Sequence, residues 1–193
     1  MAVFVATNSI PGTGRHVARD LLKERLVTTP TRGPGPQLIL GATPSSRLSA
    51  LIGQGLWFTA RNSIPVMPIG AIIGVPGSGT WLAEALLQAW NRNRVRGETL
   101  PKHLHLTPEN GRMSLIEKYA ASEDGRILIV DGVLTGSDAP ERRALRAALQ
   151  ALTAQGLRAG RLLVLIDHVR GPARQAEGVH CLSLCSGADF LPA

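Results

Sequence analysis

The sequence has few aromatic residues, only two cysteines and no long apolar run. Phe, Trp and Tyr make up 4% of its 193 residues, so aliphatic side chains must fill the core. Cys181 and Cys185 are too few for a disulfide framework or a metal site, and on one strand both would point to the same face. No run approaches the roughly 20 apolar residues that span a bilayer. The opening MAVFVATNS lacks the features of a signal peptide, so we expect a cytoplasmic protein without a membrane segment.

The chain also has fewer acidic than basic residues. The chain holds 21 Lys and Arg against 14 Asp and Glu, which gives a net charge of +7. The arginines are scattered, no run of four basic residues occurs, and no aromatic residues interleave with them. Nucleic acid is therefore not the expected partner, although the basic segment 92–96 leaves RNA binding open as a minor alternative. A surface that attracts small phosphorylated anions accounts for the charge equally well.

The stretch GRILIVDGVLTGS, residues 125–137, organises the rest of the chain. Its apolar run predicts a strand buried on both faces that ends at Asp131. The turn expected after it contains Gly132, Thr135, Gly136 and Ser137, whose backbone N–H and hydroxyl groups can bind an anion. We therefore expect a phosphate-and-sugar site at the carboxyl edge of a parallel sheet.

A second glycine-rich turn lies in IGAIIGVPGSGT, residues 69–80, before the predicted helix 81–90. Gly74 and Gly79 match the opening of a phosphate-binding Walker loop, but Thr80 and Trp81 replace its lysine and its metal-binding hydroxyl. A nucleoside triphosphatase is therefore a minor alternative. Generic anion binding at a helix N-terminus is favoured, and a purely structural turn stays open.

The remaining pattern alternates strands with helices. Apolar spacing predicts helices over 15–26, 43–53 and 140–155, with Gly156 at the C-terminal cap of the last, and strands over 3–5, 38–40, 162–166 and 179–184. Residues 91–113 are polar and basic, and are expected to form a long exposed excursion between strands. His103 and His105 alternate with leucines there, as on a strand with one wet face. The whole predicts a doubly wound parallel sheet.

Read together, these segments resemble an orotate phosphoribosyltransferase. ILIVDGVLTGS, LLVLIDH and GVHCLSLCSGADFL resemble the second half of such an enzyme, and GAIIGVPGSGTWLAEAL resembles its pyrophosphate-binding strand and loop. ENGRMSLIEK resembles the segment after the mobile catalytic loop, and LVTTPTRGPGPQLIL resembles the base-binding ribbon. The resemblance implies the α/β type I phosphoribosyltransferase fold, with a mostly parallel central sheet flanked by helices and a small N-terminal hood. It covers residues 1–193 as a single domain, with the helix and hood ribbon over about 1–40 and the core sheet over about 65–190.

The family transfers ribose 5-phosphate from phosphoribosyl pyrophosphate to a nitrogen base, with Mg²⁺, and orotate-type members serve pyrimidine nucleotide synthesis as homodimers. By this resemblance Asp131 would hold a ribose hydroxyl, and Thr135, Gly136 and Ser137 would enclose the 5-phosphate. The pyrophosphate would lie against Pro76, Gly77, Ser78, Gly79 and Thr80. His105 and Lys102 are the candidate catalytic groups from the mobile-loop region, and no residue is expected to ligate the metal directly.

The chain also departs from the family pattern. Gly132 stands where a second acid is usual, and the positions of the loop lysines and histidine, counted back from Gly111, hold Asn110, Pro108 and His105. Each lost charge removes transition-state stabilisation, typically about 2–4 kcal/mol. The alternative is a catalytically inactive relative that binds a phosphorylated nucleotide or acts as a regulatory or interaction protein.

Overall fold

A six-stranded sheet forms the centre of the molecule. The computed structural model describes residues 13–27, 44–63, 69–109, 112–119, 126–134, 140–168 and 175–190. The described strands are β1 (Ile69–Gly74), β2 (Lys102–Leu104), β3 (Leu106–Glu109), β4 (Arg112–Leu115), β5 (Arg126–Leu134), β6 (Ala159–Asp167), β7 (Gln175–Ala176) and β8 (Val179–Ser186). The described helices are α1 (Thr13–Lys23), α2 (Ser46–Ser63), α3 (Ser78–Asn93), α4 (Pro140–Ala154) and the short 3₁₀ helix η1 (Gly187–Phe190).

The sheet has the strand order β2-β1-β5-β6-β8-β7. Every neighbouring pair is parallel except β7 and β8, which form an antiparallel hairpin at the edge. Strands β3 and β4 form a separate two-stranded hairpin. The predicted mostly parallel sheet flanked by helices is therefore confirmed, and its described strands lie within the expected core region.

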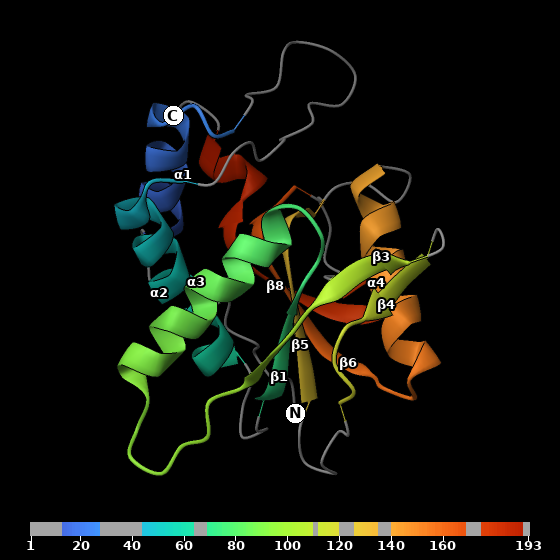
Figure 1. The fold of residues 1–193 in the computed structure, drawn as a ribbon. Helices are drawn as coiled ribbons and strands as arrows, with labels where there is room; N and C mark the ends of the chain where they lie inside the picture. Colours follow the sequence, from blue (N-terminus) through green and yellow to red (C-terminus); the bar gives the residue numbers. More distant parts are fainter. Residues whose placement is uncertain are drawn as a thin grey trace, which may run out of the picture.

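Helices cover both faces of the sheet (Figure 1). On one face, α1, α2 and α3 pack on an aliphatic cluster that includes Ile72, Leu128 and Leu163. On the other face, α4 and Leu115 of the β3–β4 hairpin pack on a second cluster, which includes Ile129. The central strands are buried on both sides, which explains why their sequences are continuous apolar runs without alternation.

Helix α2 is longer than the sequence predicts. It continues to Ser63, so Trp57 and Phe58 lie within it and not in a loop. The reason is the row of buried residues at helical spacing: Leu48, Ile52, Leu56 and Ala60. This stripe outweighs the low helix propensity of the glycines inside it.

The segment 91–113 is not one long exposed excursion. It holds the end of α3, all of β2 and β3, and the start of β4. Leu104 is 1% exposed and is paired with Ile73 of β1, and this burial holds β2 to the sheet edge. The alternation of His103 and His105 with leucines therefore predicted extended structure correctly at His103, whereas His105 lies between β2 and β3 and not in a strand.

The two cysteines do not share a face. Cys181 packs in the cluster under α4, whereas Cys185 packs in the cluster under α1 and α2. Both thiols are buried and neither forms a disulfide. The consecutive residues Leu184 and Cys185 both pack in the cluster under α1 and α2, although the register of β8 with β6 is the same from Leu162↔Cys181 to Asp167↔Ser186. The strand therefore does not keep a simple alternation over these four residues.

Some predicted features lie outside the described residues. They are the strands expected at 3–5 and 38–40, most of the hood ribbon, and the turn residues Thr135, Gly136 and Ser137. The single-domain division stays a prediction. No helix among the described residues is long and apolar enough to cross a membrane.

Substitution of Gly53 tests whether the close packing of α2 on α3 constrains the fold. A Cβ at Gly53 would collide with the backbone carbonyl of Ala85 on α3. Gly→Ala inside a helix normally stabilises by roughly 0.5–1 kcal/mol, but here we expect Gly53→Ala to lower the free energy of unfolding by about 1–3 kcal/mol. Urea denaturation measures the difference.

Gly55→Ala in the same helix is the matched control. Its Cβ would meet only the side-chain end of Leu184, at 2.8 Å from Cδ2, which can rotate away. We expect the Gly55→Ala protein to lose less stability than the Gly53→Ala protein. Equal losses, or a gain in both, would show that the close approach of α2 to α3 does not constrain the fold.

Candidate functional site

The strand order reverses between β1 and β5, and this reversal defines the candidate site. From β1 the chain passes through α3 to β2 on one side, and from β5 it passes through α4 to β6 on the other side. Because α3 and α4 cover opposite faces, the carboxyl ends of β1 and β5 form a topological switch point, the place where open α/β sheets have their ligand crevice.

The glycine-rich turn after β1 lies directly against β5. The N–H of Val75 donates to the carbonyl of Val130 at 2.8 Å. A Cβ on Gly79 would collide with that same carbonyl, and a Cβ on Gly74 would collide with the carbonyl of Gly79. Only glycine at both positions allows the start of α3 to pack this closely on the strand.

Helix α3 begins at Ser78, earlier than predicted, so Ser78, Gly79 and Thr80 form its first turn. Gly77 precedes it with φ +104°, a conformation that favours glycine, and no side chain in the described part of the chain caps this end. The first N–H groups of a helix have no partner within the helix. Together with the positive end of the helix dipole, they suit a bound anion.

Asp131 lies beside this turn, but it is not the last residue of its strand. The predicted end at Asp131 is wrong, because β5 continues to Leu134. Val133 and Leu134 are buried and pair with Ile166 and Asp167 of β6, which extends the strand on that side.

On the β1 side the pairing does end at Gly74↔Val130. Asp131 therefore follows the last residue paired with β1, while it pairs with Val164 on the other side. One carboxylate oxygen accepts a 2.7 Å hydrogen bond from the N–H of Gly132. Asp131 is half-buried and lies next to the strand that leads into the glycine-rich turn.

The neighbouring strands bring further polar groups to the same edge. Asp167 ends β6, where it pairs with Leu134 on one side and Ser186 on the other. The N–H of His168 donates to the carbonyl of Leu134 at 3.0 Å. Thus two carboxylates, Asp131 and Asp167, belong to the carboxyl-terminal halves of adjacent strands.

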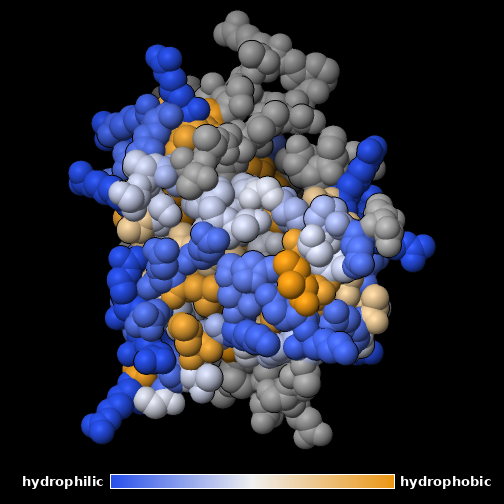
Figure 2. Space-filling model, viewed as in Figure 1, coloured by the Kyte–Doolittle hydropathy of each residue, from blue (hydrophilic) through white to orange (hydrophobic). Residues whose placement is uncertain are grey.

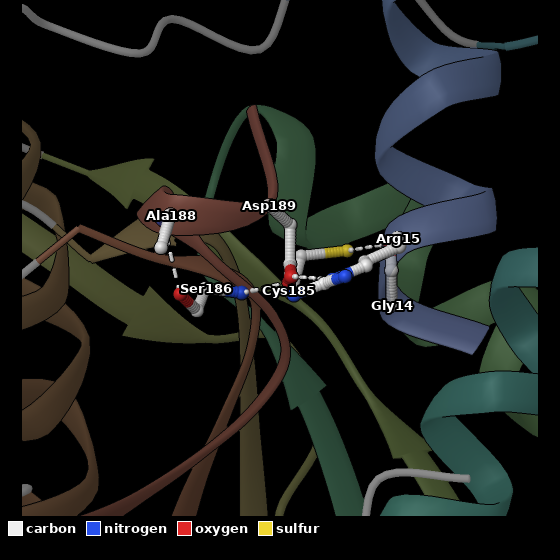
Figure 3. Close-up of polar contacts among 6 residues, drawn as sticks. All are labelled: Gly14, Arg15, Cys185, Ser186, Ala188 and Asp189. Atoms are coloured by element: carbon white, nitrogen blue, oxygen red, sulfur yellow. Dashed lines mark hydrogen bonds and ion pairs between the residues drawn. The ribbon is translucent and has the colours of Figure 1, made fainter. Parts of the chain in front are cut away.

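The first turn of α1 reaches this edge at β8 (Figure 3). Asp189 accepts a 2.7 Å hydrogen bond from the N–H of Ser186 and lies 3.7 Å from Nε of Arg15. Cys185 donates to the carbonyl of Gly14 at 3.3 Å, and burial, assisted by the charge of Asp189, raises the pKa of its thiol. Cys185 is therefore a structural thiol and not a nucleophile.

Arg15 is the cation that sequence reasoning missed at this edge. Its side chain is 84% exposed, so the guanidinium is available to solvent and ligands despite the contact with Asp189. Local sequence signals cannot find it, because Gly14 and Cys185 meet across 171 residues of chain.

His105 is held by Glu117 at the base of the β3–β4 hairpin. One oxygen of Glu117 lies 2.8 Å from Nδ1 of His105, and the other accepts a 2.9 Å hydrogen bond from the His105 N–H. Partial burial acts to raise the pKa of Glu117, but the hydrogen bonds from His105 outweigh it and hold the pKa below its usual value. The pair joins the residue before β3 to the segment that follows β4.

Lys102 and His103 lie earlier on β2. Lys102 pairs with Ala71, three residues before the end of β1, and its ammonium lies 5.9 Å from the ring centroid of Tyr119. The His103 ring lies 4.1 Å from the His105 ring, and burial followed by the charge of His105 lowers the pKa of His103.

The structure thus brings Asp131 and residues 76–80 together. It sets Lys102 apart from them by the register of β2, and it engages His105 with Glu117. No group of three or more His, Cys, Asp or Glu side chains that could hold a metal ion occurs among the described residues.

His103 should make the free energy of unfolding depend on pH. Its lowered pKa means that the folded state favours the neutral ring, so the unfolded chain binds more protons below about pH 6.5. The free energy of unfolding should fall as pH drops from 7.5 through 6.5 to 5.5. Urea denaturation of the His103→Gln protein should show a flatter decline over this range.

The exposed His16 provides the matched control. A His16→Gln protein should keep the pH dependence of the wild-type protein, because this change leaves the His103 environment intact. Parallel curves for the His103→Gln and wild-type proteins would contradict the assignment.

Comparison with known proteins finds solved structures that share this fold. Neither a protein-family model nor a curated protein sequence matches the chain. A phosphoribosyltransferase from Corynebacterium diphtheriae superposes with a TM-score of 0.63 at 18% identity, over 93% of this chain and 98% of the other. Orotate phosphoribosyltransferase from Mycobacterium tuberculosis H37Rv, in complex with 5-phospho-alpha-D-ribosyl 1-diphosphate, superposes with a TM-score of 0.59 at 18% identity over 98% of both chains.

A larger protein also contains this fold. UMP synthase from Leishmania donovani superposes with a TM-score of 0.63 at 13% identity, over 92% of this chain and 36% of the other, so the chain spans about a third of that protein. At identities this low, the structural similarity establishes the fold alone. This fold is the one that the sequence resemblance implies. The chain has the type I phosphoribosyltransferase fold, which the orotate phosphoribosyltransferases among these structures share, at a divergent sequence.

Proposed function

We propose that the chain binds phosphoribosyl pyrophosphate at the switch point between β1 and β5 and transfers its ribose 5-phosphate to a nitrogen base. The observation that carries this proposal is the packing of Gly79 on the Val130 carbonyl, which brings an uncapped helix N-terminus next to Asp131. An anion site beside a carboxylate suits a ligand that has both phosphates and sugar hydroxyls. The fold of the orotate enzymes supports the orotate-type reaction, in a homodimer of the cytoplasm.

The residues take distinct roles in this proposal. The N–H groups of the turn and first helical turn, residues 76–80, hold the departing pyrophosphate. Asp131 accepts a hydrogen bond from a ribose hydroxyl and stabilises the positive charge that develops at C1 as the pyrophosphate leaves. Thr135, Gly136 and Ser137 enclose the 5-phosphate.

The donor set at this edge fits a magnesium ion that arrives on its substrate. Mg²⁺ prefers oxygen ligands and is commonly held by one or two carboxylates together with substrate phosphates. Asp131 and Asp167 lie on adjacent strands and would hold the ion through water, while the described residues contain no complete cluster for a metal. Bound in this way, Mg²⁺ neutralises charge on the pyrophosphate.

A second candidate function is binding without turnover. Gly132 leaves Asp131 without the adjacent acid, His105 is engaged by Glu117, and Lys102 is paired to the middle of β1. Because of these features, few charged groups remain to stabilise the transition state of transfer, whereas binding of the ligand needs fewer of them. A relative that binds a phosphorylated nucleotide and regulates a partner would need only the anion turn and Asp131.

Substitution of Asp131 tests the site itself. We expect Asp131→Asn to weaken binding of phosphoribosyl pyrophosphate with Mg²⁺ at least about tenfold, because it removes the charged acceptor for the ribose hydroxyl. Isothermal titration calorimetry measures binding, and pyrophosphate release with a panel of bases measures turnover. Turnover by the wild-type protein supports the transferase, and saturable binding without turnover supports the second candidate.

Asp20→Asn is the control for this experiment. It also removes one acidic side chain, but from the α1 surface where Asp20 pairs with Lys23. This variant should bind as the wild-type protein does. Unchanged binding in the Asp131→Asn protein, with thermal unfolding that shows a native fold, would refute the proposed site.

A further inference from the structure

The loop after α3 is held rigidly by Glu98. The Glu98 carboxylate accepts hydrogen bonds from the indole N–H of Trp90 at 3.1 Å and from the N–H of Val95 at 3.2 Å. It also forms a 2.8 Å ion pair with Arg61 at the end of α2, whose guanidinium lies 5.8 Å from the Trp90 ring centroid. One acid therefore ties the ends of α2 and α3 to the turn between them, and these contacts occupy its charge.

Three arginines at the end of α3 and in the loop after it form no ion pair with an acidic side chain in the described part of the chain. They are Arg92, Arg94 and Arg96, and all of them are exposed. Arg92 donates a 3.3 Å hydrogen bond from Nε to the carbonyl of Gln88 on its own helix. The space-filling view is blue where α3 ends and the following loop begins (Figure 2).

We propose that this arginine surface, formed by Arg92, Arg94 and Arg96, binds the phosphate backbone of a nucleic acid independently of sequence. Guanidinium groups bind phosphate oxygens through paired hydrogen bonds, and they lose less hydration than ammonium groups. The surface consists of three cations on a braced turn, with Asn91 exposed beside them. Phosphate contacts of this type need charge and reach, and they need no pocket.

The composition of the surface favours a nucleic acid over the other polyanions. Val95, 63% exposed, is the one large apolar side chain exposed on the 91–98 segment, which is too little to insert into a lipid surface. The aromatic ring nearby, Trp90, is 3% exposed and cannot act as an anchor for a protein partner. Its burial also excludes stacking on bases, so the contact is with the backbone.

This surface is separate from the proposed substrate site. Helix α3 has 16 residues, so its two ends lie about 24 Å apart. The substrate site adjoins its N-terminus and the arginine surface its C-terminus. Binding at one end leaves the other end open, and the two proposals can fail independently.

The test is binding of a fluorescein-labelled single-stranded RNA of 20 nucleotides, measured by fluorescence anisotropy at 50 and 200 mM salt. Three phosphate contacts predict that the wild-type protein binds roughly 20-fold more weakly at the higher salt. In the triple variant R92A/R94A/R96A the affinity at 50 mM salt should fall at least about tenfold, and its salt dependence should be nearly flat. Circular dichroism verifies that the variant is folded.

The triple variant R19A/R47A/R143A is the matched control. It removes three exposed arginines, and the same net charge, from α1, α2 and α4. It should keep at least half of the wild-type affinity. Equal losses in the two triple variants would show an effect of net charge alone and overturn the proposal, as would the absence of RNA binding by the wild-type protein at 50 mM salt. Binding only to vesicles of anionic lipid would also overturn it.

Discussion

The contact of Gly79 with the carbonyl of Val130 is the constraint on which the candidate site depends. It presses the start of α3 onto β5, and the hydrogen bond from Val75 to the same carbonyl holds the turn in place. Because α4 leaves β5 on the opposite face, the pressed turn lies at the reversal of strand order. The sheet topology provides the switch point, and this contact brings helix N–H groups to it.

The proposed site has fewer charged side chains than an efficient enzyme that transfers or releases phosphate groups would need. The anion donors are backbone groups, and the nearest carboxylate, Asp131, lacks an acidic neighbour at Gly132. Arg15 brings a cation to the edge at β8, but it lies against Asp189. In the proposed site, binding would rest on fixed backbone geometry, while turnover would need positive charge that the described residues supply only sparsely. The same scarcity of acids leaves the far end of α3 strongly positive.

Much of the fold could be predicted from the sequence, because the buried strands are continuous apolar runs and the helices have regular stripes. The glycine-rich turn after β1 and the strand that carries Asp131 could be predicted for the same reason, since local patterns encode a strand followed by a glycine turn. Local patterns do not encode tertiary contacts. Val133 and Leu134 continue β5 because they pair with β6, and Cys181 and Cys185 belong to different clusters because Leu184 and Cys185 pack together under α1 and α2. The long-range contact of Arg15 with Asp189 has no sequence signal, and neither does the bracing of the arginine surface by Glu98.

The most direct test of the central claim is hydrogen–deuterium exchange of the protein with and without phosphoribosyl pyrophosphate and Mg²⁺. If the switch point is the binding site, the amides of residues 75–80 and 131–134 become protected when the ligand is added, while those of 92–100 do not change. Protection confined to other segments, or none at a ligand concentration that saturates binding, would contradict the account.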